Sequence, residues 1–360
     1  MQSHCMQENN KAEPVFGFVV PVYKTPGVYI EECVNSLLAQ TYKNIQIVIV
    51  NDASPDNSGE VCEEIAKKDP RIKVVHHEVN GGLPVARNTG IDNLPEADWI
   101  AVIDSDDWVE PDMCEKLLQH IQKEYADVYM YSGFRNIGET EVQMNFHYPH
   151  EKQFTTYEER ELLQKQLFLD QTKDCVAGSF PIQSANNRLY SAKYLREKNV
   201  RFIKVRFAED ALTHMHSLEV ADKVIYLQYR FYHYRDTPGS MTNGYRVTAD
   251  AEQLSVVREL VAFAEQYHKS QEFVSLMHIF VFMSMQMCVW QKYFHPENTA
   301  PYRVRKKACM ELFKNAPYDK ALSVIKNLPL SKLRTNQIIK YYLMKYHCYG
   351  LLVWLRNRAS

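Results

Sequence analysis

The chain has no pair of cysteines at CxxC spacing, although it contains eight cysteines in 360 residues. Zinc sites and redox motifs use closely spaced pairs, and small secreted domains use cysteines as a disulfide framework. Scattered thiols are typical of a reducing compartment. We therefore expect neither a zinc site nor a disulfide framework, and we expect a cytoplasmic location.

The chain also has little net charge and no apolar leader. Its formal charge is -2 at pH 7, so the charge balance does not predict nucleic acid as a partner. The opening residues, MQSHCMQENNKAEP, contain no apolar core, which predicts that there is no signal peptide. We find no run of about twenty apolar residues, and on that ground expect no helix that spans a bilayer.

No Gly/Ser-rich linker, internal repeat or low-complexity tract divides the chain. Hydrophobic residues make up 46% and charged residues 24%, which is ordinary for a globular protein and argues against disorder. A chain of this length suffices for one large domain or two ordinary ones. We expect a loose polar tail over 1–13 and a gradual boundary near 246.

Short apolar stretches alternate with helical patterns after the tail. The expected strands are Val15–Tyr23, Ile45–Asp52, Ile72–His77 and Trp99–Asp104. The second of them is nearly continuous in Ile and Val, which is typical of buried parallel strands. The alternation predicts an α/β protein with a mostly parallel, Rossmann-like sheet, right-handed crossovers and flanking helices.

Local signals set the expected ends of these elements. Pro21 should end the first strand, and Asn57 should cap the second helix, with Glu60 three residues on as in a capping box. Pro84 falls near the first turn of a short helix. The aromatic middle, about 125–245, reads as an extra strand pair with loops on the same sheet.

The last third of the chain turns helical. From about Asp250, Leu254, Val257, Val261 and Ala264 recur at helical spacing and predict one apolar face.

Polar residues follow three of the expected strands. Pro21, Val22 and Tyr23 end the first, Asn51 and Asp52 the second, and Asp104, Ser105 and Asp106 the fourth. Ligands of open α/β sheets bind beyond the carboxyl ends of the strands, so these groups should converge.

Two carboxylates at i and i+2 suit a hard cation, Mn²⁺ or Mg²⁺, and a cation that also binds a diphosphate offsets their repulsion. The alternative is a solvated turn in which Asp107 caps the next helix.

Four stretches in order resemble the signatures of family 2 glycosyltransferases, the inverting enzymes of GT-A fold, of the bacterial polysaccharide-biosynthesis type. They are VVPVYK, VNDASPDNS, GGLPVARNTG and IDSDDWVEPDM, and the resemblance covers about 14–245. It implies a catalytic domain over 14–245, with a nucleotide-sugar half at 14–124 and an acceptor-side half at 125–245. Residues 246–360 would form a helical C-terminal region.

The resemblance also implies roles for the strand ends. Pro21 and Tyr23 would flank the base of a nucleotide-sugar, usually a UDP-sugar, and Asp52 would accept a hydrogen bond from uracil. Asp104 would lie near the ribose and the metal, and Asp106 would bind the metal that bridges the phosphates.

The stretch FAEDALTH resembles the family's ED motif, in which Asp210, beside Glu209, takes the proton from the acceptor hydroxyl. One carboxylate facing the donor suffices for a single in-line displacement. The alternative is that the acidic pair only begins a helix.

The stretch YRFYHYRDTPGSMT matches the family's late loop, which closes over the diphosphate. On that match Arg235 and Ser240 would contact phosphate oxygens. His233 is either a third metal ligand or a histidine packed among aromatic rings. Arg87 either supports the acidic turn or contacts the donor.

The chain ends in a stretch rich in Tyr, Leu, Lys and Arg. A basic aromatic helix over 336–358 could lie on the inner face of the cell membrane, against anionic headgroups, or pack on the catalytic domain. The same apolar end could also form a homodimer face.

The sequence thus predicts a glycosyltransferase that moves a hexose or N-acetylhexosamine onto a glycan or lipid-linked acceptor. Two alternatives stay open, a non-catalytic nucleotide-sugar-binding protein and a sugar nucleotidyltransferase. Sugar nucleotidyltransferases carry an N-terminal Gly-rich, basic phosphate-binding loop, which the stretch VVPVYKTPG does not resemble.

Overall fold

The computed structural model describes residues 13–169, 184–236, 244–327 and 334–359. The chain packs as two compact units, and each is treated by itself. The first comprises residues up to Tyr125 together with Arg188–Asn199, and the second comprises Ala126–Asn187 and Val200–Ser360. The functional division at 13, 124 and 245 stays a prediction.

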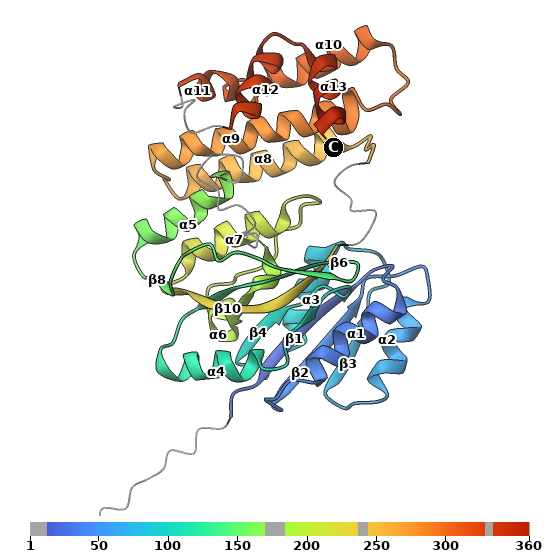
Figure 1. Ribbon diagram of the computed structural model, residues 1–360, viewed down its shortest axis with the longest axis vertical. Coiled ribbons are helices and arrows are strands. Elements are labelled where there is room, and N and C mark those ends of the chain that lie inside the picture. Colours follow the sequence, from blue (N-terminus) through green and yellow to red (C-terminus); the bar gives the residue numbers. More distant parts are fainter. Residues whose placement is uncertain (1–12, 170–183, 237–243, 328–333, 360) are drawn as a thin grey trace, which may run out of the picture. The chain divides into compact units, whose positions relative to one another are not determined.

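The first unit is built on parallel strands with helices between them (Figure 1). Its elements are β1 (Phe16–Val22), α1 (Gly27–Leu38), β2 (Ile45–Asn51), α2 (Ser58–Ala66), β3 (Ile72–His76), α3 (Leu83–Asp92), β4 (Trp99–Val102), β5 (Trp108–Val109), α4 (Met113–Lys123), β9 (Arg188–Ser191) and α6 (Ala192–Glu197). The strand order is β3-β2-β1-β4-β9, parallel except for β9, which runs antiparallel to β4. The α/β class is confirmed.

Strand β1 is fully buried, and it continues through Pro21 to Val22. The expectation that Pro21 ends the strand was therefore wrong. Pro21 lacks an N–H, but β4 pairs with β1 only as far as Val19, so no strand lies on that side at residue 21. Pro21 still pairs in register with Val50 of β2 on the other side.

Helix α2 begins as expected but is capped differently. Asn57 stands at the N-cap without a side-chain capping bond. The carboxylate of Asp56 instead accepts hydrogen bonds from the backbone N–H and the hydroxyl of Ser58, at 3.2 and 2.6 Å. These bonds, led by the one from the hydroxyl, hold the pKa of Asp56 below its usual value.

Helix α3 packs tightly against β1. A Cβ at Gly90 would collide with the side chain of Val19, so only glycine permits this approach. Arg87 lies one turn before Gly90, and both are buried. The close approach therefore carries the Arg87 guanidinium into the interior beside the strand ends.

The second unit combines a strand pair with a helical region. Its elements are β6 (Val128–Ile137), β7 (Thr140–Gln143), β8 (Lys152–Phe154), α5 (Tyr157–Leu169), η1 (Ala185–Asn187), α7 (Glu209–Val220), β10 (Val224–Arg235), α8 (Ala249–Gln266), α9 (Gln271–Cys288), η2 (Val289–Tyr293), α10 (Tyr302–Lys314), α11 (Ala321–Asn327), α12 (Thr335–Lys345) and α13 (Tyr349–Ala359). Strands β6 and β10 are parallel, and β7 and β8 add antiparallel edges to them. The middle of the chain thus contains the expected strand pair, but it also contains helices where loops were expected.

The helical C-terminal region is present. Figure 1 shows α8 and α9 side by side, with α10 to α13 on one side of them and α5 and α7 on the other. Val257 and Ala264 of α8 are buried, but Leu254 and Val261 lie only at the margin of the core. Val256 and Leu260 take the interior positions, so the buried face is rotated relative to the predicted one.

Helix α9 with η2, Gln271–Tyr293, is long and apolar enough to cross a membrane by length and composition alone, which corrects the expectation that no stretch qualifies. Within its most apolar window, 61% of the residues are buried inside the protein. A helix that is apolar all round is also what the core of a large folded unit requires.

The C-terminal stretch expected as one helix forms two. Helix α12 ends before Tyr346, and α13 begins at Tyr349. His347 between them has a φ of 56°, a left-handed conformation that interrupts the helix.

Candidate active site

The carboxyl ends of three parallel strands meet at one edge of the first unit. Val22 of β1 pairs with Asn51 of β2, and Asn51 pairs with His76 of β3. On the other side of β1, the N–H of Ile103 donates to the carbonyl of Val19 at 2.9 Å. Residues 21–23, 51–52 and 104–106 therefore leave the sheet at the same edge.

The end of β1 presents one large ring to solvent. Pro21 and Val22 are buried, and the side chain of Tyr23 is 46% exposed. The next residue, Lys24, has a φ of 53°, and its N–H donates to the Ser54 hydroxyl at 3.2 Å. This bond ties the β1 end to the loop after β2, so Tyr23 stands beside that loop.

Asp52 is buried at the centre of a hydrogen-bond network. The N–H groups of Gly81 and Gly82 donate to its two carboxylate oxygens, each at 2.8 Å. Nδ1 of His77 lies 2.7 Å from Oδ1 of Asp52, and Nε2 lies 2.9 Å from the Thr89 hydroxyl. Because an ionised carboxylate only accepts, Nδ1 carries the proton of that bond.

These hydrogen bonds are shared unequally between the two carboxylate oxygens of Asp52. Oδ1 accepts two bonds, and Oδ2 accepts one, from Gly82. A carboxylate oxygen has two acceptor positions, so Oδ2 retains one for a further donor. Gly82 has a φ of 85°, which favours glycine at the point where the loop turns onto Asp52 and into α3.

The three carboxylates of the acidic turn after β4 differ in their exposure to solvent. Asp104 and Asp106 are partly exposed, whereas Ser105 and Asp107 are buried. The turn is closed by the N–H of Asp107, which donates to the carbonyl of Asp104 at 3.0 Å. Helix α4 begins only after Asp112, so Asp107 does not cap it.

Arg87 and Thr25 bind the acidic turn through their side chains. Nη2 of Arg87, whose side chain is 1% exposed, lies 3.0 Å from Oδ1 of Asp104. The hydroxyls of Thr25 and Ser105 are 2.8 Å apart. Arg87 thus contacts the acidic turn, and its charge offsets part of the repulsion between the carboxylates.

The exposed carboxylates fit a divalent cation of the magnesium type. Among the described residues, no group of three or more His, Cys, Asp or Glu side chains is arranged to hold a metal by itself. Mg²⁺ commonly takes one or two carboxylates and completes its shell with water and substrate phosphates. Asp104 and Asp106, spaced i and i+2 and partly exposed, provide such a pair.

Asp210 lies in the first turn of α7 in the second unit. Its Oδ2 accepts a hydrogen bond from the N–H of Ala185 at 3.2 Å, and the side chain is partly exposed. The N-cap residue, Ala208, has a left-handed φ of 54°. Left-handed residues other than glycine are uncommon and cluster at functional sites.

His233 on β10 is packed rather than open. Its ring stacks on Phe134 with centroids 4.4 Å apart, and Nδ1 lies 3.3 Å from the carboxylate of Glu141. These contacts match the aromatic-packed alternative. Arg235 ends β10 and is partly exposed, in register with Asn136. Ser240 lies outside the described residues.

Sequence reasoning missed the residues that hold Asp52 in place. The sequence analysis did not single out His77, Asn80 or Thr89. Asn80 contributes a further bond, from its side-chain amide to the carbonyl of Asp52 at 3.1 Å. A usable signal was the Asn-Gly-Gly stretch directly before a helix with proline at its start, which indicates a turn whose N–H groups face an acceptor.

The sequence of the first unit and of part of the second matches a protein-family model. Residues 18–197 match glycosyl transferase family 2, and the chain belongs to that family. It is a glycosyltransferase, which removes the sugar nucleotidyltransferase and the non-catalytic protein from consideration.

The chain is also similar to named glycosyltransferases. The chain is 34% identical over 62% of its length to glycosyltransferase GlyA of Streptococcus pneumoniae, of which it spans only 31%. It is 32% identical to the uncharacterised glycosyltransferase EpsJ of Bacillus subtilis, over 71% of each chain. The fold resembles the crystal structure of Staphylococcus aureus TarS 1–349 in complex with UDP-GlcNAc, with a TM-score of 0.59, 16% identity and coverage of 96% of this chain and 92% of that one.

Proposed function

We propose that the protein transfers a sugar, with inversion, from a UDP-sugar to a hydroxyl of a glycan or lipid-linked acceptor in polysaccharide assembly. One observation carries the proposal: the ends of β1, β2 and β4 bring Asp52 and the acidic turn to one edge of the sheet. The UDP-GlcNAc bound by TarS and the hyaluronan synthase of Pasteurella multocida among the relatives support the same class of donor and product.

In this proposal the β1 and β2 ends bind the nucleobase. The Tyr23 ring packs on the flat face of uracil, and Oδ2 of Asp52 accepts from its ring N–H. Because the other positions on Asp52 are taken by Gly81, Gly82 and His77, its carboxylate is already oriented before the donor arrives. Preorganisation of this kind lowers the entropy lost on binding.

The acidic turn receives the diphosphate. Asp104 and Asp106 would hold a Mn²⁺ or Mg²⁺ ion, which supplies positive charge to the departing phosphates. Arg235, with its planar fork of donors, and Ser240 are assigned to phosphate oxygens. Arg87 keeps Asp104 in place through the ion pair at 3.0 Å.

The transfer itself is one displacement. The acceptor oxygen bonds to the anomeric carbon as the bond from that carbon to the phosphate oxygen breaks, and UDP leaves. Asp210 takes the proton of the acceptor hydroxyl. Asp210 lies in the first turn of α7, where the N–H of Ala185 donates to its Oδ2 and the side chain is partly exposed, so the carboxylate can be reached by an acceptor.

A thermal-shift panel tests the proposed donor. UDP-sugars with Mn²⁺ should raise the melting temperature by several degrees, because saturation at about 100 times Kd adds about 2.7 kcal/mol of stability. GDP- and CDP-sugars should raise it far less, and EDTA should remove most of the effect of UDP-sugars. A larger shift with another nucleotide, or an undiminished shift in EDTA, would refute the donor or the metal assignment respectively.

Replacing His77 tests whether Asp52 is preorganised. His77→Leu removes the bond to Asp52 and should weaken UDP binding about tenfold, since a hydrogen bond to a charged group contributes about 1.5–3 kcal/mol. His77→Asn keeps an N–H near the position of Nδ1 and should retain most of the affinity. Isothermal titration calorimetry with UDP measures both.

His76→Leu is the matched control for this pair of variants. The His76 ring contacts Asn51 and Glu63 but not Asp52, so its loss should change UDP affinity less. Equal losses in His77→Asn and His77→Leu would show that the hydrogen bond to Asp52 is not what His77 contributes.

A further inference from the structure

The C-terminal sixty residues differ from the rest of the chain in charge. Residues 301–360 contain thirteen Lys or Arg and two Asp or Glu, a formal charge of +11. Because the whole chain carries -2, residues 1–300 carry -13. From Lys320 to the last residue there is no acidic side chain. The balanced total therefore conceals a strongly cationic end.

Helices α12 and α13 expose apolar stripes. On α12, Ile339, Tyr342 and the following Tyr346 are exposed at positions i, i+3 and i+7, whereas Tyr341 and Met344 are buried in the core. A helix that packs on one face normally presents polar residues on the other. On α12, large hydrophobic side chains therefore occupy solvent-facing positions where polar side chains are usual.

Helix α13 repeats the pattern. Leu351, Trp354 and Leu355 are exposed at i, i+3 and i+4, and Leu352 is buried. A Cβ at Gly350 would stand 4.0 Å from the ring of Tyr302, which is itself 47% exposed at the start of α10. The start of α13 thus adjoins the start of α10.

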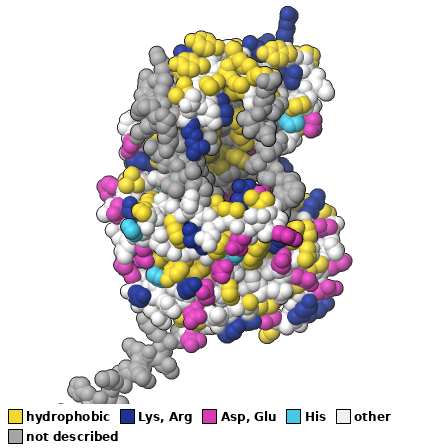
Figure 2. All heavy atoms as spheres, in the orientation of Figure 1, with side chains coloured by type: hydrophobic (Ala, Val, Ile, Leu, Met, Phe, Trp, Pro, Cys, Tyr) yellow, Lys and Arg dark blue, Asp and Glu magenta, His cyan; other side chains and the backbone are white. Residues whose placement is uncertain are grey.

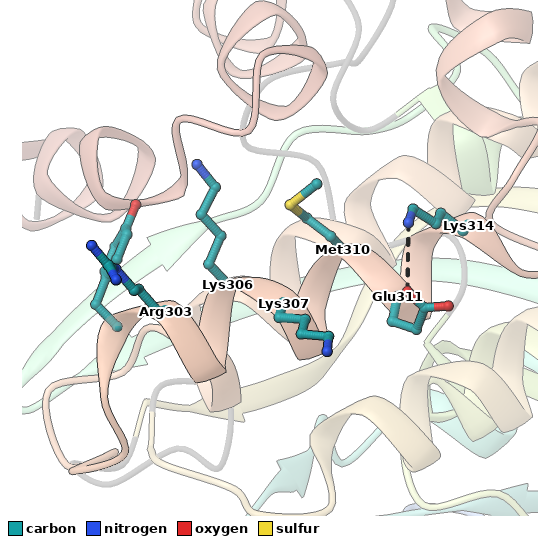
Figure 3. Close-up of a pocket in the computed structure, with 7 residues that line it drawn as sticks. Arg303, Lys306, Lys307, Met310, Glu311 and Lys314 are labelled. Carbon is teal, nitrogen blue, oxygen red and sulfur yellow. Dashed lines mark ion pairs between the residues drawn. The ribbon is translucent and has the colours of Figure 1, made fainter.

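Helix α10 adds cations to this surface. Arg303, Lys306, Lys307 and Lys314 line a shallow hollow of about 330 Å³ together with Tyr302 and Met310. Figure 3 shows these side chains ranged along α10 with a single acid among them, Glu311, paired with Lys314 at 3.5 Å. Figure 2 shows hydrophobic side chains gathered at the top of the view over the C-terminal helices, with Lys and Arg side chains beside them.

We propose that this surface, formed by α10, α12 and α13, docks the protein on an anionic lipid bilayer. Tyr and Trp rings are favoured at the boundary between headgroups and acyl chains, and Lys and Arg are attracted to anionic headgroups. A second copy of the chain is a poorer occupant, because it would bring two cationic surfaces together. The inference stands apart from the proposed donor and mechanism.

Vesicle co-sedimentation with the full chain tests the inference. Vesicles of phosphatidylcholine and phosphatidylglycerol should bind the protein, and vesicles of phosphatidylcholine alone should bind it far less. Binding should fall as salt is raised, because the attraction is screened within a Debye length. Equal binding to both vesicles, or none to either, would overturn the proposal.

Three sets of substitutions separate the contributions to docking. Arg303→Gln/Lys307→Gln/Lys314→Gln should lower the partition coefficient at least tenfold, because each cation near the surface contributes about fivefold. Tyr342→Ser/Leu351→Ser/Trp354→Ser should lower it while leaving its salt dependence intact. Lys67→Gln/Lys68→Gln/Lys193→Gln, which removes three exposed cations from the first unit, is the matched control and should leave binding unchanged.

Two further measurements keep the outcome clear. All variants should retain the melting temperature of the parent chain, so a loss of docking is not a loss of folding. Sedimentation equilibrium should give the parent chain and the Tyr342→Ser/Leu351→Ser/Trp354→Ser variant the same oligomeric state. An association of the parent chain that this variant loses is not expected. Such an association would assign the surface to a second copy and overturn the proposal.

Discussion

Asp210→Asn is expected to slow sugar transfer by a factor of about 10² to 10⁴, the range that a positioned general base contributes. The amide cannot take the proton of the acceptor hydroxyl, although its oxygen still accepts the hydrogen bond from Ala185. The fold and the donor site should therefore persist, and UDP affinity measured by calorimetry should change less than twofold. Release of UDP in the presence of donor and acceptor measures the rate.

Glu209→Gln is the control for this result. It removes the same charge from the same turn of α7, so any general effect of charge on the helix or on the diphosphate appears in both variants. The Asp210 variant should be much slower than the Glu209 variant. Equal loss in the two, or equal loss of rate and UDP affinity in Asp210→Asn, would show that Asp210 is not the base.

Asp106→Asn is expected to weaken UDP binding in Mn²⁺ by about tenfold to a hundredfold while leaving binding in EDTA nearly unchanged. Asp106 is a partly exposed carboxylate of the acidic turn, and it is assigned to the ion that joins the protein to the diphosphate. An amide is a weaker ligand for a hard cation than a carboxylate. The two affinities, measured side by side, isolate the part of binding that depends on the metal.

Asp112→Asn provides the comparison for Asp106. It removes a carboxylate a few residues along the same chain segment, one that pairs with Lys116 at the start of α4 and not with the acidic turn. Its UDP affinity should match that of the parent chain. A loss in Asp106→Asn that is equally large in EDTA would assign Asp106 to the nucleoside, not to the ion.

Much of the first unit follows from local sequence. The apolar runs at β1, β2 and β4 form buried parallel strands, because both faces of such strands must be apolar. The positions of Asp52 and Asp104 follow in turn, since each comes within two residues of the end of a strand of known direction. The family motifs identified the same edge.

Other features could not be read locally. Asp56 replaces Asn57 as the capping group because the path of the chain before α2 decides which side chain reaches the N–H of Ser58. The break between α12 and α13 depends on the left-handed turn at His347, where no glycine or proline signals it. The apolar character of α9 resembles that of a spanning helix, and its burial in the core depends on the helices packed around it.

The sequence by itself determined the alternating α/β order, the polar strand ends and the cationic end of the chain, because all three rest on residue type and spacing. Only the tertiary structure decided which side chains are enclosed. It buried Asp107 and Arg87 while leaving Asp104 and Asp106 accessible, and it surrounded Asp52 with Gly81, Gly82 and His77. Burial and hydrogen-bond partners depend on contacts between segments far apart in the chain, which no local pattern records.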